Sequence, residues 1–238
     1  MGKRITSQAR GKGSLTFRVR PRAYRYKVSY PDLKIEGKAK IVKLFNSSAH
    51  STPLIKVQVD GKESFICPAA SGIYEGQEIE ICGKIDEVSG AENGSIARLK
   101  DVPQGTKVFN IENNPGKGGE FLRSSGCSGV VMNKDDKTVE IIIRRRKLRL
   151  NKDCRATVGV AAGEGRLSKP LVKAGKQHHR MKAQGRKWHR TSAVKTNAID
   201  HPFGGGRGKR IKSKIAKRNA PPGRKVGHIR PKRTGRKK

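Results

Sequence analysis

The chain has 238 residues, with 55 Lys and Arg against 19 Asp and Glu, and a formal net charge of +36. This excess is larger than solubility requires and predicts a polyanionic partner. No segment approaches the roughly 20 apolar residues of a membrane span, and the start Met1-Gly2-Lys3-Arg4 has no apolar stretch behind it. We therefore expect no membrane partner and no secretory signal.

The positive charge is concentrated at the two ends of the chain. Residues 1–30 hold nine basic and no acidic residues, residues 31–165 hold 21 basic and 18 acidic ones, and residues 166–238 hold 25 basic residues and one acid, Asp200. The ends have little apolar content and repel themselves, so we expect them to be disordered in isolation. The near-neutral middle is long enough to bury the cores of one or two small domains.

The first part of the middle predicts β-strands. Apolar and polar residues alternate over 54–59 and again over 76–83, and shorter apolar runs cover 38–45 and 64–67. Asp60-Gly61 supplies a two-residue hairpin turn, and a short helical turn is expected over 69–72. Several short strands at this spacing favour a small closed barrel, for which an OB-type barrel is the most economical choice.

A second set of strands follows. We expect strands over 105–111, 129–132, 138–143, 147–150 and 156–160, a hairpin loop over 133–137, and an irregular glycine-rich loop over 113–119. These elements predict a second barrel of five or six strands over about residues 85–162. Helix signals are weak elsewhere, and a helix over 209–218 would need phosphates to quench its self-repulsion. The predicted fold class is therefore mainly β.

The cysteines do not predict a metal site. Their spacing is wide and contains no Cys-x-x-Cys pair, so we expect reduced, mostly buried thiols and no zinc. They are Cys67, Cys82, Cys127 and Cys154. The glycine-lysine pairs at 11–12 and 208–209 lack the spacing of a phosphate loop, so NTP hydrolysis is not expected either.

Aromatic and imidazole side chains lie among the cations of the last third. We expect His178 and His179 to add hydrogen bonds and stacking surface in an RNA-contacting loop. Trp188, the only tryptophan, is either a stacking platform for an unpaired base or an anchor of the tail on the second barrel. The sequence does not separate these two interpretations.

The one acid of the tail precedes a histidine, a proline and a glycine run. Asp200-His201 could be an acid-oriented imidazole as in general base catalysis, but no nucleophile is identifiable beside it. In the structural interpretation Asp200 holds His201 or caps a turn, Pro202 stiffens the chain, and the glycines 204–206 let backbone amides approach phosphates. The sequence favours the structural interpretation.

These residues resemble a known family. The segment 197–206, Asn-Ala-Ile-Asp-His-Pro-Phe-Gly-Gly-Gly, preceded by 185–190, Gly-Arg-Lys-Trp-His-Arg, is similar to the signature of the universal ribosomal large-subunit protein two family. Segments 84–111, 158–163 and 173–176 are also similar to that family, and 10–14 resembles the amino-terminal arm of its archaeal and eukaryotic branch. Lys195-Thr196 departs from the small residue and Met expected there, which affects local packing alone.

The resemblance implies a domain order. It implies a basic N-terminal arm at 1–35, an OB-fold barrel at 36–84, an SH3-like barrel at 85–165 and a basic rRNA-penetrating extension at 166–238. It further implies a cytoplasmic, non-enzymatic constituent of the large ribosomal subunit. This constituent organises rRNA near the peptidyl-transferase region and supports subunit association and tRNA binding.

The implied partners are large-subunit rRNA, small-subunit rRNA at an intersubunit bridge, and neighbouring ribosomal proteins. No small-molecule substrate and no cofactor are expected, apart from Mg²⁺ that could bridge to rRNA. The histidine that matches His201 is a contested catalytic candidate in that family, and no residue is assigned as catalytic here. A DNA- or chromatin-condensing protein is the alternative from charge alone, and direct participation in peptide-bond catalysis is a weaker one.

Charge and resemblance together select candidate rRNA-binding residues in the two ends of the chain. They are Arg10, Lys12, Arg18, Arg20, Arg22, Lys176, His178, His179, Arg180, Arg186, Lys187, Trp188, His189, Arg190, Asn197, Asp200, His201, Gly204, Gly205, Gly206, Arg207, Lys209 and Arg210.

Overall fold

The computed structural model describes residues 11–59, 63–83, 92–189, 191–207 and 214–231. The chain divides into two compact units. The globular unit comprises Arg20–Ala174, and the basic unit comprises Met1–Val19 together with Gly175–Lys238. Strand residues far outnumber helix residues in the described part of the chain, which confirms the mainly β class predicted from the sequence.

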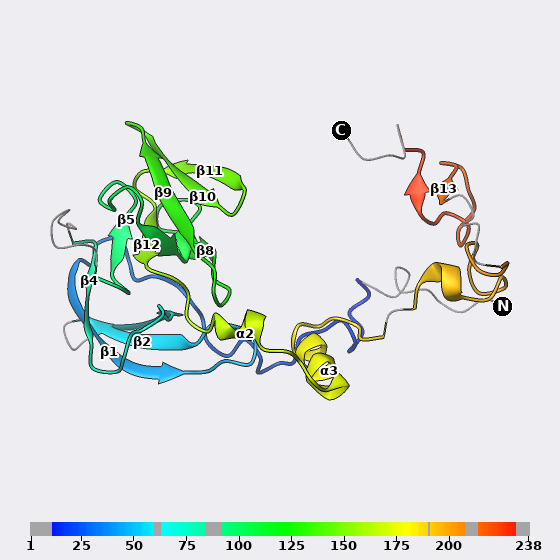
Figure 1. The fold of residues 1–238 in the computed structure, drawn as a ribbon, viewed down its shortest axis with the longest axis horizontal. Helices are drawn as coiled ribbons and strands as arrows, with labels where there is room; N and C mark the ends of the chain where they lie inside the picture. The colour runs from blue at the N-terminus through cyan, green and yellow to red at the C-terminus, as the bar shows by residue number, and fades with distance from the viewer. Residues whose placement is uncertain (1–10, 60–62, 84–91, 190, 208–213, 232–238) are drawn as a thin grey trace. The chain divides into compact units, whose positions relative to one another are not determined.

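The globular unit is built on one extended sheet (Figure 1). Its strands are β1 Gly37–Phe45, β2 Leu54–Val59, β3 Glu63–Pro68, β4 Glu78–Ile81, β5 Ile96–Arg98, β6 Lys107–Phe109, β9 Gly129–Lys134, β10 Thr138–Ile143, β11 Arg146–Asn151 and β12 Arg155–Val158. They follow the order β11-β10-β9-β6-β12-β5-β4-β1-β2-β3. The described pairs are antiparallel except β4 with β5, which are parallel at Ile81 and Ile96.

Two large hydrophobic cores and a smaller cluster of Ala70, Phe109 and Ala161 lie along this sheet. The first is formed by alternate residues of β1–β4, such as Ile41, Val57 and Ile79. The second is formed mainly by β6 and β9–β12 and includes Val108 and Ile141. The side-chain period of two places these apolar residues on one face of each strand. Two cores agree with two sets of predicted strands, and the assignment of the halves as OB and SH3-like barrels stays a prediction.

Short elements of the globular unit differ from the predicted ones. Strand β5 and the pair β7 Ile111–Glu112 with β8 Gly119–Phe121 were not anticipated, because two or three residues are too few to show alternation. The expected helical turn over 69–72 is wrong, since Ala70 forms a β-bridge with Ala161. The predicted Asp60-Gly61 turn lies outside the described residues. A four-residue helix, α2 Gly165–Ser168, completes the described elements of this unit.

The basic unit holds short elements with little buried surface. They are helix α3 Ala174–Ala183, the 3₁₀ turn η1 Ala193–Lys195, and the parallel strands β13 Ile215–Ala216 and β14 His228–Ile229. Helix α3 buries no side chain, so its sequence lacks the apolar 3.6-residue period that would have predicted it. The helix expected over 209–218 is wrong at 215–216, which form β13, and its residues 209–213 lie outside the described part.

Candidate nucleic-acid interface

The segment 197–206 folds into a tight turn, here called the His201 turn. The carbonyl of Asn197 accepts the N–H of His201 at 3.3 Å, and the carbonyl of His201 accepts the N–H of Gly204 at 2.8 Å. The N–H of Gly205 donates to the carbonyl of Thr196 at 3.0 Å and closes the turn. The backbone here is therefore ordered by its own hydrogen bonds.

His201 is a structural element of this turn. Its side chain is buried, with a relative exposure of 6% for the residue, and its Nδ1 accepts the N–H of Phe203 at 3.0 Å. The two rings also lie against each other, with centroids 5.0 Å apart. Because Nδ1 acts as an acceptor, a neutral imidazole carries its proton on Nε2. The ring therefore ties the turn to Phe203, whereas the expected contact of Asp200 with His201 stays a prediction.

The glycines of the turn serve its internal packing. A Cβ at Gly204 would collide with the carbonyl oxygens of Asn197 and Thr196, so no other residue fits. Gly205 and Gly206 adopt φ of +73° and +81°, the left-handed region that favours glycine. The amides of Gly204 and Gly205 already have partners inside the turn, and the expected approach of backbone amides to phosphates stays a prediction.

Helix α3 presents cations and imidazoles to solvent. Lys176 and Arg180 are four residues apart, so they share one face of the helix and repel each other. His178 and His179 lie on the same helix rather than in the expected loop, with ring centroids 5.4 Å apart. All four side chains are exposed. An external anion is needed to relieve the repulsion, because α3 itself contains no acid.

The chain after α3 contacts the N-terminal segment. A Cβ at Gly185 would lie 3.0 Å from the carbonyl oxygen of Phe17, so residues 17–19 pass directly beside this glycine. The contact brings two predicted cation groups into one unit, Arg18 on one side and Arg186 with Lys187 on the other. Trp188 is half-buried beside His189, with ring centroids 4.7 Å apart, and its role as a stacking platform stays a prediction.

The remaining predicted cations are exposed where the structure describes them. Lys12 and Arg207 belong to the basic unit, whereas Arg20 and Arg22 belong to the globular unit. Four further predicted residues lie outside the described part of the chain, namely Arg10, Arg190, Lys209 and Arg210. Nothing in the described contacts pairs Lys12, Arg18, Arg20, Arg22 or Arg207 with a carboxylate.

One cluster of cations was missed in the sequence. Ile143 pairs with Arg146, so Arg144 and Arg145 form a two-residue turn at the tip of the β10–β11 hairpin, here called the arginine hairpin. Nearby Glu140 binds Arg149 at 2.7 Å, and this hydrogen bond holds the pKa of Glu140 below its usual range. Arg144, Arg145 and Arg146 are exposed and have no carboxylate partner among the described residues. The run Arg-Arg-Arg between two predicted strands was the available signal.

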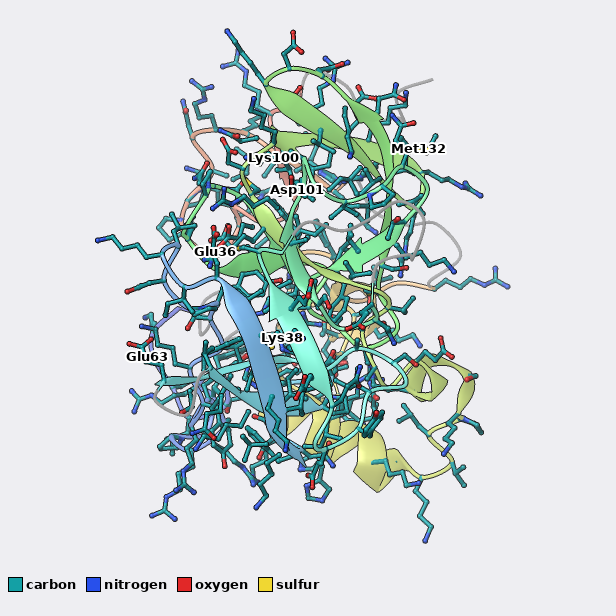
Figure 2. All side chains as sticks on the ribbon, turned by 90° about the vertical axis from the view of Figure 1, so that its left-hand side faces the viewer. Glu36, Lys38, Glu63, Lys100, Asp101 and Met132 are labelled. Carbon is teal, nitrogen blue, oxygen red and sulfur yellow. The ribbon has the colours of Figure 1, made fainter. Side chains whose placement is uncertain are left out.

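The surface of the globular unit otherwise mixes both signs of charge. The acids Glu36 and Glu63 and the bases Lys38 and Lys100, labelled in Figure 2, are all exposed. The Nη2 atom of Arg98 in β5 donates to Glu36 before β1 at 2.6 Å, which links the two halves. This balanced surface contrasts with the basic unit, where Asp200 is the one acid.

The described residues hold neither a metal cluster nor a membrane segment. No three His, Cys, Asp or Glu side chains gather there as ligands, and no helix there is long and apolar enough to cross a membrane. Burial raises the pKa of Cys67 to about 12 and that of Cys154 to about 11, so both are unreactive thiols. Cys82 and Cys127 are half-buried, which leaves the expectation of mostly buried cysteines half met.

Comparisons with known proteins point in one direction. A family model described as "Ribosomal Proteins L2, C-terminal domain" matches residues 92–223. The chain is 42% identical over 247 residues to the large ribosomal subunit protein uL2 of Archaeoglobus fulgidus, with 99% of each chain covered. It is 40% identical over 242 residues to the protein of the same name from Haloarcula marismortui, with 99% of this chain and 98% of the relative covered. For Methanocaldococcus jannaschii the identity is 39% over 246 residues, with both chains fully covered.

Proposed function

The chain belongs to the uL2 family of large ribosomal subunit proteins, and on this premise we propose how it binds ribosomal RNA. It is a structural constituent of the large ribosomal subunit in the cytoplasm, and it is not an enzyme. The globular unit supplies a folded body, and the basic unit supplies most of the charge that holds rRNA.

The observation that carries this proposal is the charge of the basic unit. Residues 1–19 and 175–238 hold 27 basic residues and one acid, and the described cations there lie at the surface. Each Lys or Arg that neutralises a phosphate releases a condensed counterion, so binding is tight at low salt. Helix α3 is a clear case, because Lys176 and Arg180 repel each other until phosphates lie between them.

The His201 turn gives this unit a defined shape. Double-stranded RNA is recognised through its backbone and minor groove, and loops are recognised by stacking. We propose that the turn enters rRNA as a preformed element, near the peptidyl-transferase region that the family resemblance implies. Small-subunit rRNA at an intersubunit bridge and support of tRNA binding are further parts of this proposal.

The salt dependence of binding tests the electrostatic part. If ~10 cations each neutralise a phosphate, the slope of log K against log salt for large-subunit rRNA should lie near about −7 to −9. Changing Lys176, Arg180, Arg186 and Lys187 to Gln should flatten the slope by about 3 to 4. The matched control changes four exposed lysines of the globular unit to Gln, at positions 38, 40, 43 and 56. A slope near about −2 for the unmodified chain contradicts the proposal.

The role of His201 is tested by separating assembly from chemistry. His201→Ala removes the acceptor of the Phe203 N–H, so fewer large subunits should incorporate the protein. Subunits that do assemble should form peptide bonds at nearly the normal rate. His228→Ala, which changes an exposed ring that is not among the candidate rRNA-binding residues, is the control. A large loss of the chemical step in fully assembled particles would revive the catalytic interpretation.

A further inference from the structure

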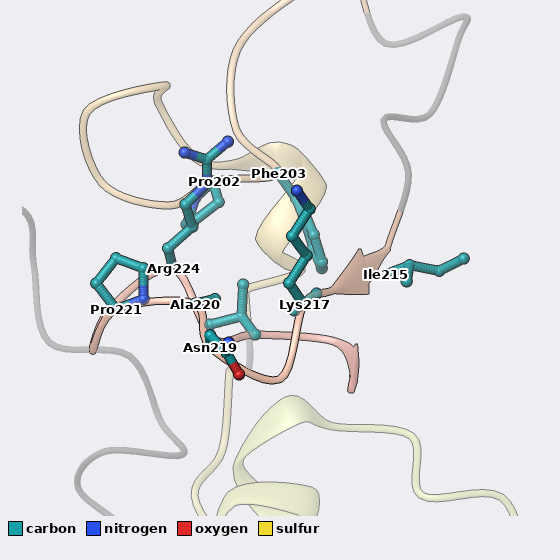
Figure 3. A pocket seen from close by; sticks show the side chains of 10 residues that line it. Pro202, Phe203, Ile215, Lys217, Asn219, Ala220, Pro221 and Arg224 are labelled. Atoms are coloured by element: carbon teal, nitrogen blue, oxygen red, sulfur yellow. The ribbon is translucent and has the colours of Figure 1, made fainter. Parts of the chain in front are cut away.

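A pocket of about 530 Å³ lies inside the basic unit, beside the His201 turn (Figure 3). Pro202 and Phe203 of the turn form part of its wall, and β13 with residues 217–226 forms the rest. Its size lies within the range of pockets that bind small organic groups. Neither the sequence analysis nor the proposed function assigns this pocket a ligand.

The walls combine apolar surface with two cations. Phe203, Pro221 and Val226 contribute ring and methyl surface. Arg224 and Lys217 line the pocket together with Pro202 and Phe203 (Figure 3). None of the lining residues is acidic. A flat apolar face flanked by positive charge fits a nucleotide, whose base stacks on aromatic surface and whose phosphate attracts Lys and Arg.

The pocket is held in shape by hydrogen bonds outside its lining. The Phe203 N–H is bound by Nδ1 of His201 at 3.0 Å, which fixes the aromatic wall. On the opposite side the His228 N–H donates to the carbonyl of Lys214 at 2.7 Å. A Cβ at Gly227 would lie 2.8 Å from Cζ of Phe203, so the backbone just before β14 passes close to the ring. A preformed wall reduces the ordering cost of binding.

We propose that this pocket binds one unpaired nucleotide of large-subunit rRNA. The base lies against Phe203, and Lys217 and Arg224 contact its phosphate. His201 then acts as a positioning residue, because it holds the backbone of Phe203 and does not itself reach the base. This inference rests on the proposed rRNA-binding function and gives one site of that interface a ligand.

The test compares base-bearing and abasic ligands of equal charge. The full chain is titrated with a fluorescent oligoadenylate and with an abasic ribose-phosphate oligomer of the same length. One stacked base should favour the oligoadenylate by about 5-fold to 150-fold. Ala220→Phe fills the pocket without changing charge and should remove most of that preference. Ala193→Phe makes the same change at a half-buried site outside the pocket and should preserve it.

Lys217→Gln and Phe203→Leu separate the contribution of charge to binding from that of stacking. Lys217→Gln should lower the affinity for both oligomers. The loss should exceed that of Lys195→Gln, which removes the same charge outside the pocket. Phe203→Leu keeps the apolar wall but removes the aromatic face, so it should reduce the oligoadenylate preference alone.

Two outcomes would contradict the proposal that the pocket binds a nucleotide. One is an equal affinity of the unmodified chain for both ligands, and the other is an equal loss of preference in Ala220→Phe and Ala193→Phe. If either occurs while binding to large-subunit rRNA stays steeply salt-dependent, the nucleotide site is rejected and the proposed rRNA-binding function is retained. A flat salt dependence would instead reject the proposed function itself.

Discussion

Removing the Glu112 carboxylate should destabilise the globular unit strongly. Glu112 and Arg155 are completely buried, with side-chain exposures of 0% and 1%. Oε1 of Glu112 accepts the Arg155 Nη2–H at 2.9 Å and the Nε–H at 3.2 Å, and Oε2 accepts the Arg155 backbone N–H at 2.9 Å. The same carboxylate accepts the N–H groups of Gly116 at 3.3 Å and Gly118 at 3.1 Å.

This pair joins three parts of the chain. Arg155 in β12 donates from Nη1 to the carbonyl of Pro31 at 2.8 Å, and its guanidinium lies 5.2 Å from the centroid of the Tyr30 ring. The Tyr30 hydroxyl donates to the carbonyl of Asn110 at 2.7 Å. The N-terminal entry to the sheet, the glycine-rich loop after β7 and strand β12 therefore share one ion pair.

The expected loss in the free energy of unfolding follows from the burial of both charges. Breaking a buried pair leaves a charge without water or partner and costs about 3–5 kcal/mol. Glu112→Gln and Arg155→Met should each lower the free energy of unfolding by about that amount. The double variant leaves neither charge unpaired, so its loss should fall short of the summed single losses by about 1–3 kcal/mol.

Urea unfolding of the full chain, followed by far-UV circular dichroism, measures these values. Lys100→Gln serves as the control, because its pair with Asp153 at 3.4 Å is exposed and worth less than about 1 kcal/mol. Single losses below about 1 kcal/mol, or a double loss equal to the sum, would refute the reasoning.

Three further outcomes are expected. Burial and, second, the Arg123 charge lower the pKa of His50, so the unfolded state binds more protons and stability should fall as pH falls below about 6.5. The urea midpoint of His50→Gln should no longer fall with pH in this range. A midpoint that falls as in the unmodified chain would contradict the role of His50. Replacing all three arginines of 144–146 with Gln should flatten the salt slope of rRNA binding by about 2 to 3, more than the same change at lysines 38, 40 and 43. Gly204→Ala should reduce incorporation into large subunits, measured by co-sedimentation, far more than Gly175→Ala in α3, whose Cβ meets open space.

The longer strands of this fold were predictable because their residues alternate. Strands β2 and β10 occupy 54–59 and 138–143, the same ranges that the pattern predicted. Strands β5 and β8 have three residues each, and their existence depends on pairing with distant segments rather than on local pattern. Helix α3 also escaped prediction, since a helix that buries no side chain needs no apolar face.

The buried ion pair was invisible to sequence reasoning for a different reason. Glu112 precedes the glycine-rich loop and Arg155 follows Cys154, and each looks like one of many surface charges. Their pairing depends on β7 and β12 reaching the second core from sequence positions 43 residues apart. Charge patterns predict which residues face solvent on average, but they do not identify the exceptions that the fold brings together.

The candidate interface contains two classes of residues, those that shape the His201 turn and the exposed cations. His201 and Gly204, which carry the family signature, have their Nδ1 and N–H groups bound within the turn itself. Lys176 and Arg180 are exposed to solvent and contribute positive charge without a specific shape. It follows that the two classes should fail differently when changed. Substitutions in the turn should change whether the protein enters the large subunit while leaving the salt slope nearly constant. Substitutions of cations should change the slope in proportion to the charge removed, because each contributes one counterion release and no shape.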